Sequence, residues 1–269
     1  MRLVRLLPKL LLVIAAFAVL LFLLSPILAV IGGSFNAAEY FAFPPDSFSL
    51  KHYYAAFTNK EHIASLLTSL KIAAYSTIVA SLLCVPACIV LAKSTNSAIK
   101  KLKNLFMAPI FLPGIVWAVG LMQCMGYIRM QGSMPLLICV HAVMVTPYMI
   151  RIVGASMDNF NYTLEDAAAS LGASPLNTFF RVTLPNIMSG VVVGMVFSFM
   201  ISFSEVVITL FVSSSRSTTF PVRVYAALRT EGLDPMVLAY SAIIIVIVLV
   251  ISIIGEKFAQ WSKHFSASF

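Results

Sequence analysis

The chain has 269 residues, of which 60% are hydrophobic and only 10% are charged, and its mean hydropathy is +0.97. Soluble domains are about 45–50% apolar and about 25% charged, so a water-soluble globular protein is excluded. Most of the surface must face lipid or other apolar protein. The net charge of +8 therefore concerns membrane orientation and lipid headgroups, and nucleic acid is not an indicated partner.

Six stretches are apolar enough to cross a membrane as helices, which takes about 20 residues each. They are residues 10–30, 66–92, 105–127, 134–150, 187–210 and 236–254. The fourth stretch is short and needs its flanks to reach across the bilayer. No strand alternation or long soluble domain lies between the stretches. The sequence therefore predicts an all-α integral membrane protein with six transmembrane helices.

Positive charge predicts the orientation, because cytoplasmic segments of membrane proteins are enriched in lysine and arginine. With the N-terminus in the cytoplasm, the external segments are nearly neutral, and the cytoplasmic side holds the basic residues Arg2, Arg5, Lys9, Lys93, Lys100, Lys101, Lys103, Arg151, Arg181, Lys257 and Lys263. We therefore expect both termini in the cytoplasm. A cleaved signal peptide is the alternative for the first span, but its apolar run exceeds the 7–15 residues typical of such peptides.

Two external segments are long. Residues 36–65 contain several aromatic residues beside Lys51 and His52, which indicates an amphipathic segment along the membrane surface. Residues 213–235 fit either a lid over the membrane mouth or an ordinary helical loop. The roles of Arg216 and Arg223 in this second segment stay open between binding a delivery protein and simple solvation.

The cytoplasmic segment from residue 163 to residue 185 is the most informative part of the sequence and reads TLEDAAASLGASPLNTFFRVTLP. Thr163 followed by Asp166 resembles a capping box, and acidic residues favour the first turn of a helix. Gly172 stands where a residue in the left-handed region ends a helix. A short first helix is predicted, ending near Gly172.

A second short helix is predicted to follow at once. Ser174 is a candidate N-cap, Pro175 suits the first helical position, and Pro185 is expected to break the helix before the fifth span. One face of the first helix carries a stripe of apolar side chains that are small enough for close docking, at Leu164, Ala167, Ala168 and Leu171. From the residues alone, this stripe fits either a groove on another protein or the chain's own spans.

The segment resembles the EAA loop of type I ABC importer permeases, whose pattern is Glu-Ala-Ala, three residues, Gly, nine residues, Ile, any residue, Leu-Pro. Here Asp166-Ala167-Ala168 is followed by Gly172 and then by Val182-Thr183-Leu184-Pro185. Two positions depart conservatively, with Asp166 for Glu and Val182 for Ile, and Glu165 supplies a second carboxylate.

The resemblance implies a fold, partners and a mechanism. Residues 62–254 would form the permease core, with residues 1–61 as an N-terminal helix and external segment and residues 255–269 as a cytoplasmic tail. The loop would dock into a cytoplasmic ATPase subunit through Glu165, Asp166, Ala167, Ala168, Leu171, Gly172, Ala173, Ser174, Leu184 and Pro185. The implied partners are an ATPase dimer that binds ATP and Mg²⁺, a second and different permease, and an external solute-binding protein. The chain itself would hold no cofactor and sit in the bacterial inner membrane.

A narrower resemblance concerns residues 202–229, SFSEVVITLFVSSSRSTTFPVRVYAALR, which are similar to the second permease of the spermidine/putrescine branch. It implies a polyamine as the solute. Branches for 2-aminoethylphosphonate, ferric iron and other small solutes share parts of the stretch and remain alternatives. An ion-driven carrier or channel is the alternative from another class, although no inverted repeat is evident.

Glu205 is the one acidic residue within the predicted spans, so it is a candidate for contact with a cationic solute. Trp117, Tyr127 and Phe203 are candidates to offer aromatic faces to ammonium groups. The alternative is a structural ion pair between Glu205 and Lys71. No G-x-x-x-x-G-K-[ST] loop and no hydrolase motif occurs, so we expect a non-catalytic subunit.

The remaining marked residues are expected to be structural. His141 is interpreted as a hydrogen-bond partner between helices rather than a proton relay, and Gly120, Gly190 and Gly194 as sites of close helix approach. Prolines within the spans are expected to kink helices: Pro86, Pro109, Pro113 and Pro147. The four cysteines, Cys84, Cys88, Cys124 and Cys139, suggest neither disulfides nor a zinc site, and the first two are expected to be packing residues.

Overall fold

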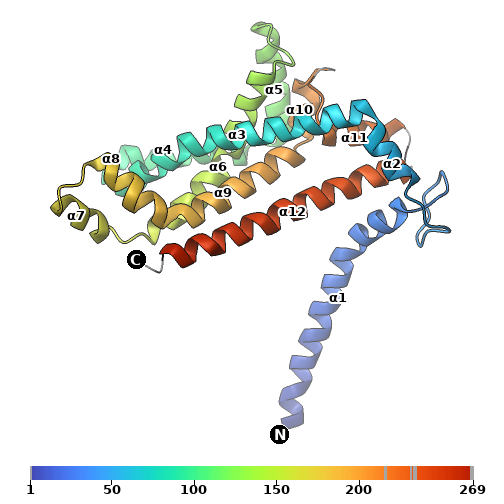
Figure 1. Cartoon of the computed structure of the whole chain (residues 1–269), viewed down its shortest axis with the longest axis horizontal. Coiled ribbons are helices and arrows are strands. Elements are labelled where there is room, and N and C mark those ends of the chain that lie inside the picture. The colour runs from blue at the N-terminus through green and yellow to red at the C-terminus, as the bar shows by residue number, and fades with distance from the viewer. Residues whose placement is uncertain (1, 215–216, 231, 233–234, 267–269) are drawn as a thin grey trace. The chain divides into compact units, whose positions relative to one another are not determined.

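The computed structural model describes the chain except residues 1, 215–216, 231, 233–234 and 267–269. Its helices are α1 Arg2–Ser34, α2 Lys51–Thr58, α3 Lys60–Lys93, α4 Ser97–Phe111, α5 Gly114–Tyr127, α6 Met134–Asp158, α7 Thr163–Ser170, α8 Pro175–Thr178, the π-helix η1 Phe179–Thr183, α9 Leu184–Ser204, α10 Val207–Val212, α11 Phe220–Thr230 and α12 Pro235–Ser266 (Figure 1). Among the described residues, the one β-type pairing is an isolated bridge between Asn36 and Phe48. The all-α prediction is confirmed.

Five helical segments are long and apolar enough to cross a membrane: Leu11–Ser34, Lys60–Lys93, Met134–Asp158, Pro175–Ser204 and Pro235–Lys257. The bent pair α4 and α5 makes a sixth if it counts as one span. The predicted spans are therefore found, but most helices extend beyond the predicted apolar windows. Beyond each predicted apolar stretch, polar and small residues continue the helix, because backbone hydrogen bonds can form whether or not the side chains are apolar.

The third predicted span is not one straight helix. The structure bends by 95° between α4 and α5. Leu112 adopts an extended conformation, with φ −92° and ψ 128°, directly before Pro113. A residue before proline is sterically driven out of the helical region, and proline offers no N–H to continue the helix. The prediction of a continuous helix over residues 105–127 is wrong for this reason.

The fifth predicted span is also displaced along the chain. The helical path starts at Pro175, passes through η1 into α9 and ends at Ser204, before Glu205. Pro185 therefore does not break the path, contrary to prediction. It lies in the first turn of α9, directly after the π-helical turn, where the wider backbone spacing accommodates a residue without an N–H.

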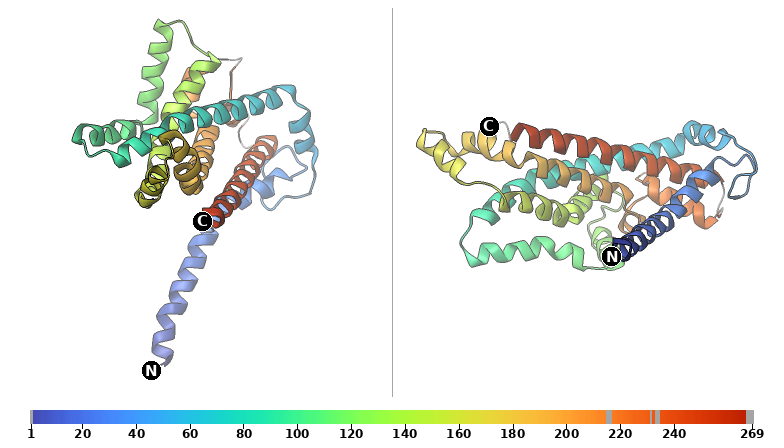
Figure 2. Two further views of the ribbon diagram at one scale, coloured as in Figure 1. Left: turned by 60° about the vertical axis from the view of Figure 1, so that its left-hand side comes forward. Right: turned by 90° about the horizontal axis from the view of Figure 1, so that it is seen from below.

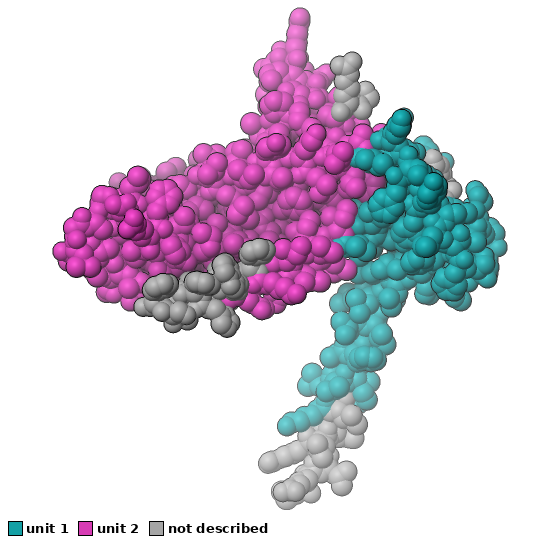
Figure 3. Space-filling model, in the orientation of Figure 1, with its two compact units in different colours: residues 1–63, 224–246 teal, residues 64–223, 247–269 magenta. Residues whose placement is uncertain are grey.

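The chain divides into two compact units, drawn in two colours in Figure 3. The first comprises residues 1–63 and 224–246. Within it, the hydroxyls of Ser34 and Tyr53 lie 2.6 Å apart, and the rings of His62 and Tyr240 stack at 4.0 Å. The predicted surface segment contains α2, of which His52 is buried. The apolar window of the membrane-length segment of α1 contains no buried residue, as expected of a helix that faces lipid or another protein, whereas Gly33 and Ser34 at its end are buried.

The second unit comprises residues 64–223 and 247–269. In it, α6 packs against both α9 and α4, and α5 packs against α10. Figure 2 shows α6 and α9 side by side in both views. Glycines permit this approach, because a Cβ at Gly194 would lie 2.6 Å from Met149 Sδ and one at Gly190 would overlap Ser156. The prediction is confirmed for these two glycines but is wrong for Gly120, which has open space around it.

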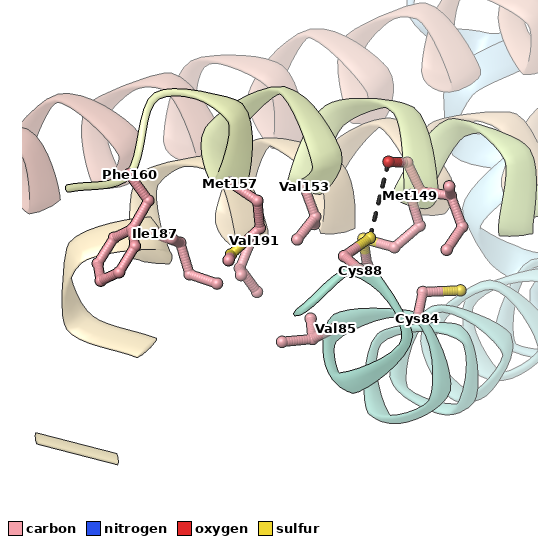
Figure 4. Close-up of a cluster of buried hydrophobic side chains, with 10 residues drawn as sticks. Cys84, Val85, Cys88, Met149, Val153, Met157, Phe160, Ile187 and Val191 are labelled. Carbon is pink, nitrogen blue, oxygen red and sulfur yellow. Dashed lines mark hydrogen bonds between the residues drawn. The ribbon is translucent and has the colours of Figure 1, made fainter. Parts of the chain in front are cut away.

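One buried cluster of the second unit joins α3, α6 and α9 (Figure 4). Cys84 and Cys88 face Met149 and Val153 within it, and Cys88 Sγ donates to the Ile150 carbonyl at 3.7 Å. Both cysteines are free and buried. Their prediction as packing residues is therefore confirmed.

Candidate functional site

The segment over residues 163–185 forms the predicted helix–turn–helix. α7 ends before Gly172, whose φ of +80° is the left-handed conformation expected of a helix stop. Ser174 caps α8 by accepting a hydrogen bond from Asn177 N at 3.4 Å. The start of α7 differs from prediction, because Thr163 is inside the helix and its N–H donates to Asn161 Oδ1 at 3.1 Å. An Asx-type cap from Asn161 has replaced the predicted capping box.

The apolar stripe of α7 is only partly covered by the described part of the chain, since Leu164 is 41% exposed and Ala168 is half-buried. No residue of α7 is buried, and Leu171 is 90% exposed. Leu176 of α8 and Phe180 of η1 continue the exposed apolar surface. An apolar patch of this kind marks an interaction site, which favours the docking interpretation over packing on the chain's own spans. We call Leu171, Leu176 and Phe180, together with Leu164, the α7–η1 patch.

The two neighbouring carboxylates of α7 face different surroundings. Asp166 is exposed, whereas the side chain of Glu165 is only 14% exposed. Glu165 Oε1 accepts a hydrogen bond from Thr183 Oγ1 at 2.5 Å, and Glu165 Oε2 forms an ion pair with Lys93 Nζ. Burial raises the pKa of Glu165, but the hydrogen bonds from Lys93 and Thr183 and the charge of Lys93 outweigh it and leave the pKa below its ordinary value.

A cavity of about 490 Å³ opens where α6, α7 and α9 meet. Its lining is mostly polar, with amides from Asn159 and Asn186 and hydroxyls from Ser156 and Ser189. Leu164 of the α7–η1 patch also lines it. α7 therefore borders open space on the side of Leu164.

The structure places Glu205 at a break in the fifth span rather than inside a helix. Glu205 Oε1 accepts from Ile208 N at 2.8 Å, and Oε2 accepts from Thr209 N at 2.8 Å and from Thr209 Oγ1 at 2.6 Å. The carboxylate thus satisfies the free N–H groups at the start of α10. In the described part of the chain Glu205 forms no ion pair with Lys71, and the carboxylate remains partly exposed.

A buried chain of hydrogen bonds leads from Glu205 to three further helices. His141 Nε2 lies 3.1 Å from Thr209 Oγ1, and His141 Nδ1 lies 2.8 Å from Ser202 Oγ. Ser202 Oγ in turn lies 3.0 Å from Ser76 Oγ. Because the Thr209 hydroxyl donates to Glu205, its oxygen accepts from His141 Nε2–H, and Nδ1 of a neutral ring then accepts from Ser202.

The hydrogen bonds of His141 therefore join α6 to α9 and α10, and Ser76 adds α3. This confirms its prediction as a hydrogen-bond partner between helices.

The three aromatic candidates lie in different surroundings. Trp117 packs in a buried cluster with Ile208 and donates from Nε1 to the Pro109 carbonyl at 3.3 Å. Tyr127 is 91% exposed at the end of α5, and Phe203 is buried, with its ring stacked on Phe199 at 6.0 Å. The structure therefore places Trp117 near α10, while Phe203 has no exposed face.

The segment over residues 213–235, which is predicted to be external, contains α11, on which Arg223 is half-buried. Arg216 lies outside the described residues. Ser69 Oγ of α3 accepts from Phe220 N at 2.8 Å, which fixes the start of α11 against that span. The segment is thus at least partly helical, as one of its two interpretations required.

Sequence reasoning missed three features: the pairing of Lys93 with Glu165, the π-helical turn η1, and the roles of Ser202 and Thr209. The role of Thr209 could have been inferred from the sequence. A carboxylate within a span needs hydrogen-bond donors, and a threonine four residues after Glu205 can supply its backbone N–H and its hydroxyl. No local pattern in the sequence could have indicated that Lys93 pairs with Glu165, since the two stand 72 residues apart.

Comparison with known proteins agrees with this architecture. The family model described as "Binding-protein-dependent transport system inner membrane component" matches residues 84–264. The molybdenum transport system permease protein ModB of Mycobacterium tuberculosis is 29% identical over 218 residues, covering 76% of this chain and 81% of that protein. The spermidine/putrescine transport system permease protein PotC of Haemophilus influenzae is 26% identical over 248 residues, covering 92% of this chain and 96% of that protein.

Among solved structures, the chain is similar to one from a bacterial ABC transporter involved in the import of the acidic polysaccharide alginate. The TM-score is 0.72 at 14% identity, over 96% of each chain. At this identity the likeness concerns the fold alone. The family match covers most of the chain, including the helix–turn–helix and the broken fifth span. The protein therefore belongs to the family of inner membrane components of binding-protein-dependent transport systems, the ABC importer permeases.

Proposed function

We propose that the chain forms half of the translocation pathway of an ATP-driven importer and receives the ATPase at the α7–η1 patch. The observation that carries the proposal is the exposed apolar surface of Leu171, Leu176 and Phe180, in a loop that the charge pattern predicts to be cytoplasmic. A cleft on an ATPase subunit accounts for this surface, because helices dock into grooves through such stripes. Asp166, exposed beside the stripe, would contribute a charged contact.

The segment proposed to couple to the ATPase is the one expected from the sequence: Glu165, Asp166, Ala167, Ala168, Leu171, Gly172, Ala173, Ser174, Leu184 and Pro185. Within it, the Glu165 carboxylate binds Lys93 and Thr183 of this chain, and Asp166 is the exposed carboxylate. ATP and Mg²⁺ would be bound by the ATPase dimer. A second, different permease would complete the pathway, and an external binding protein would deliver the solute, in keeping with the family's description. Both termini would be cytoplasmic, because the lysines and arginines gather on that side.

For the solute we propose a polyamine. PotC is similar over more of this chain than ModB, and Glu205 offers a partly exposed carboxylate at the break in the fifth span. Three of the roughly four lone-pair positions of a carboxylate are occupied by α10, which leaves room for one ammonium donor. Trp117 and Tyr127 would present aromatic faces to a cation, and the buried Phe203 would support the end of α9.

A molybdenum oxyanion is the second candidate, because ModB is slightly more identical. The charge of Glu205 separates the two candidates, since a carboxylate repels an anion and attracts a cation. 2-Aminoethylphosphonate and ferric iron remain further solutes to compare. Membership of a binding-protein-dependent family favours all of these importers over an ion-driven carrier.

The experiment is ATP hydrolysis by the co-expressed complex in liposomes, with its binding protein, titrated with spermidine, putrescine, molybdate and 2-aminoethylphosphonate. Stimulation by a polyamine supports the proposal, and stimulation by molybdate alone replaces the solute while keeping the importer. In the Glu205→Gln variant, we expect polyamine uptake to fall about tenfold, the loss of one charge-assisted hydrogen bond, with ATPase association unchanged. Unchanged polyamine uptake would remove Glu205 from the pathway.

A further inference from the structure

Glu165 joins three elements that are separated in the sequence. Its carboxylate contacts Lys93, the last residue of α3, and Thr183, the last residue of η1. The two partners stand 72 and 18 residues away along the chain. Thr183 is buried, and the Glu165 side chain is mostly enclosed. This carboxylate therefore faces the protein and not the surface that the ATPase would occupy.

The covalent chain already ties α7 to two spans. Residues 159–162 join it to the end of α6, and α8 with η1 join it to the start of α9. The span α3 has no such connection, because α4, α5 and α6 intervene before α7. A displacement of α7 thus reaches α6 and α9 through the backbone, whereas it reaches α3 through side chains such as the Lys93–Glu165 pair.

The contact with Thr183 lies at a backbone irregularity. η1 is a π-helical turn, in which the helix is locally wider, and such turns frequently accompany functional sites. Thr183 directs its hydroxyl from this turn to Glu165, so the same carboxylate holds the point where the docking segment enters α9. Charge-assisted hydrogen bonds of this type are stronger than neutral ones.

We propose that Glu165 is a positioning residue which, through Lys93 and Thr183, passes the displacement of the docking helix to α3 as well as to α9. The two acidic residues of the loop then have different roles. Asp166 contacts the ATPase, and Glu165 links α7 to α3 and η1 within the permease. This inference rests on the proposed function, because it needs an ATPase that moves α7.

The test measures solute transported per ATP hydrolysed, in proteoliposomes that contain the complete importer. The variants are Glu165→Gln, Lys93→Met and the reversed pair Lys93→Glu with Glu165→Lys. We expect the two single variants to keep the ATPase bound and hydrolysing while transport per ATP falls by about fivefold or more, the lower range of measured coupling between sites. The reversed pair restores opposite charges and should recover most of the ratio.

Two controls separate this effect from loss of folding or docking. Lys101→Met removes an exposed lysine of α4 and should leave the ratio unchanged. Asp166→Asn should weaken ATPase association, which gives the signature of impaired docking for comparison with Glu165→Gln. A purely structural role of Glu165 would lower transport and hydrolysis in proportion, which would overturn the proposal.

The two proposals fail in different ways. If the unmodified chain retains no ATPase, the proposed function itself is wrong. If the unmodified importer couples hydrolysis to transport and both single variants keep its ratio, only the role of Glu165 is wrong. If the Glu165→Gln variant does not assemble, the transport per ATP of the Lys93→Met variant tests the role of Glu165. This variant removes the same ion pair by a change at the more exposed partner.

Discussion

His141 shows how a single polar residue in a membrane segment is made stable. Both of its ring nitrogens have hydroxyl partners, and the Thr209 partner is itself held by Glu205. Unpaired polar groups in a buried site cost free energy, so a histidine here requires that every neighbour be satisfied. The broken fifth span meets this requirement by turning the N-terminal amides of α10 toward Glu205.

Replacement of His141 by alanine should therefore destabilise the protein. Ser202 and Thr209 would each lose a buried partner, which costs about 1–3 kcal/mol in free energy of unfolding. The measurement is thermal or denaturant unfolding in detergent. Val143→Ala, on an exposed position of the same helix, is the control and should change stability by less than about 0.5 kcal/mol. Equal effects of the two variants would show that the hydrogen bonds contribute nothing.

The Lys93–Glu165 pair predicts a pH dependence of stability. The folded pKa of Glu165 lies below the ordinary value of 4.5, so the pair stabilises the protein above that pH, and this contribution disappears as the pH falls through the folded pKa. It should amount to less than about 1 kcal/mol, because Lys93 is 43% exposed and solvent screens the charge. Unfolding of the unmodified chain and of Glu165→Gln should differ at neutral pH and converge in acid. A difference that persists at the lowest pH would contradict this assignment.

At the scale of elements, the spans are set by hydropathy, but their packing is set by small residues. α6 and α9 approach closely because Gly190 and Gly194 have no side chain. The breaks in the third and fifth spans have different causes. In the third span, Pro113 lacks the N–H that would continue the backbone hydrogen bonds of α4. In the fifth span, the Glu205 carboxylate accepts from the backbone amides that would otherwise extend α9 into α10.

Gly190→Ala should disrupt this packing. The added methyl would overlap Ser156, and overpacking of a close interface costs about 1–3 kcal/mol. Unfolding in detergent measures the loss, and Gly190→Ala combined with Ser156→Gly should reverse it. The matched control is Gly120→Ala, which meets no atom within 4 Å and should gain up to about 1 kcal/mol from helix propensity. A neutral Gly190→Ala would refute the close approach of α6 and α9.

At the scale of the whole molecule, two of the exposed apolar surfaces of the described residues concern assembly. One covers the membrane-length helices, where lipid or another transmembrane subunit replaces water. The other is the α7–η1 patch, which stands in the predicted cytoplasmic loop, where lipid does not cover it. The second surface is the one to which the proposed soluble ATPase would bind.

Leu171→Asp should therefore abolish assembly without unfolding the chain. Leu171 is 90% exposed, so its replacement removes no packing, but a buried anchor of an interface is worth about 2 kcal/mol or more, at least a tenfold loss of affinity. Co-purification of the ATPase measures this. Ser170→Asp, exposed but off the apolar stripe, should leave the complex intact. Full retention of the ATPase by Leu171→Asp would remove the patch from the interface.

The sequence alone determined what depends on neighbours along the chain. Apolar runs located the helices that can cross a membrane, because burial in lipid requires such runs, while the bent pair α4 and α5 makes their number five or six. Gly172 and Ser174 gave the turn between α7 and α8, because their backbone preferences are local. The EAA-type spacing from Asp166 to Pro185 indicated the family before any comparison.

Only the tertiary structure decided which distant residues meet. The direction of Glu165 depends on Lys93, and the surroundings of Glu205 depend on His141 of another helix. The 95° bend likewise required the structure, since Pro113 indicates that a helix is interrupted but not the angle at which it resumes. A local pattern fixes backbone preference, whereas side-chain partners are selected by the packing of whole helices, which no stretch of sequence contains.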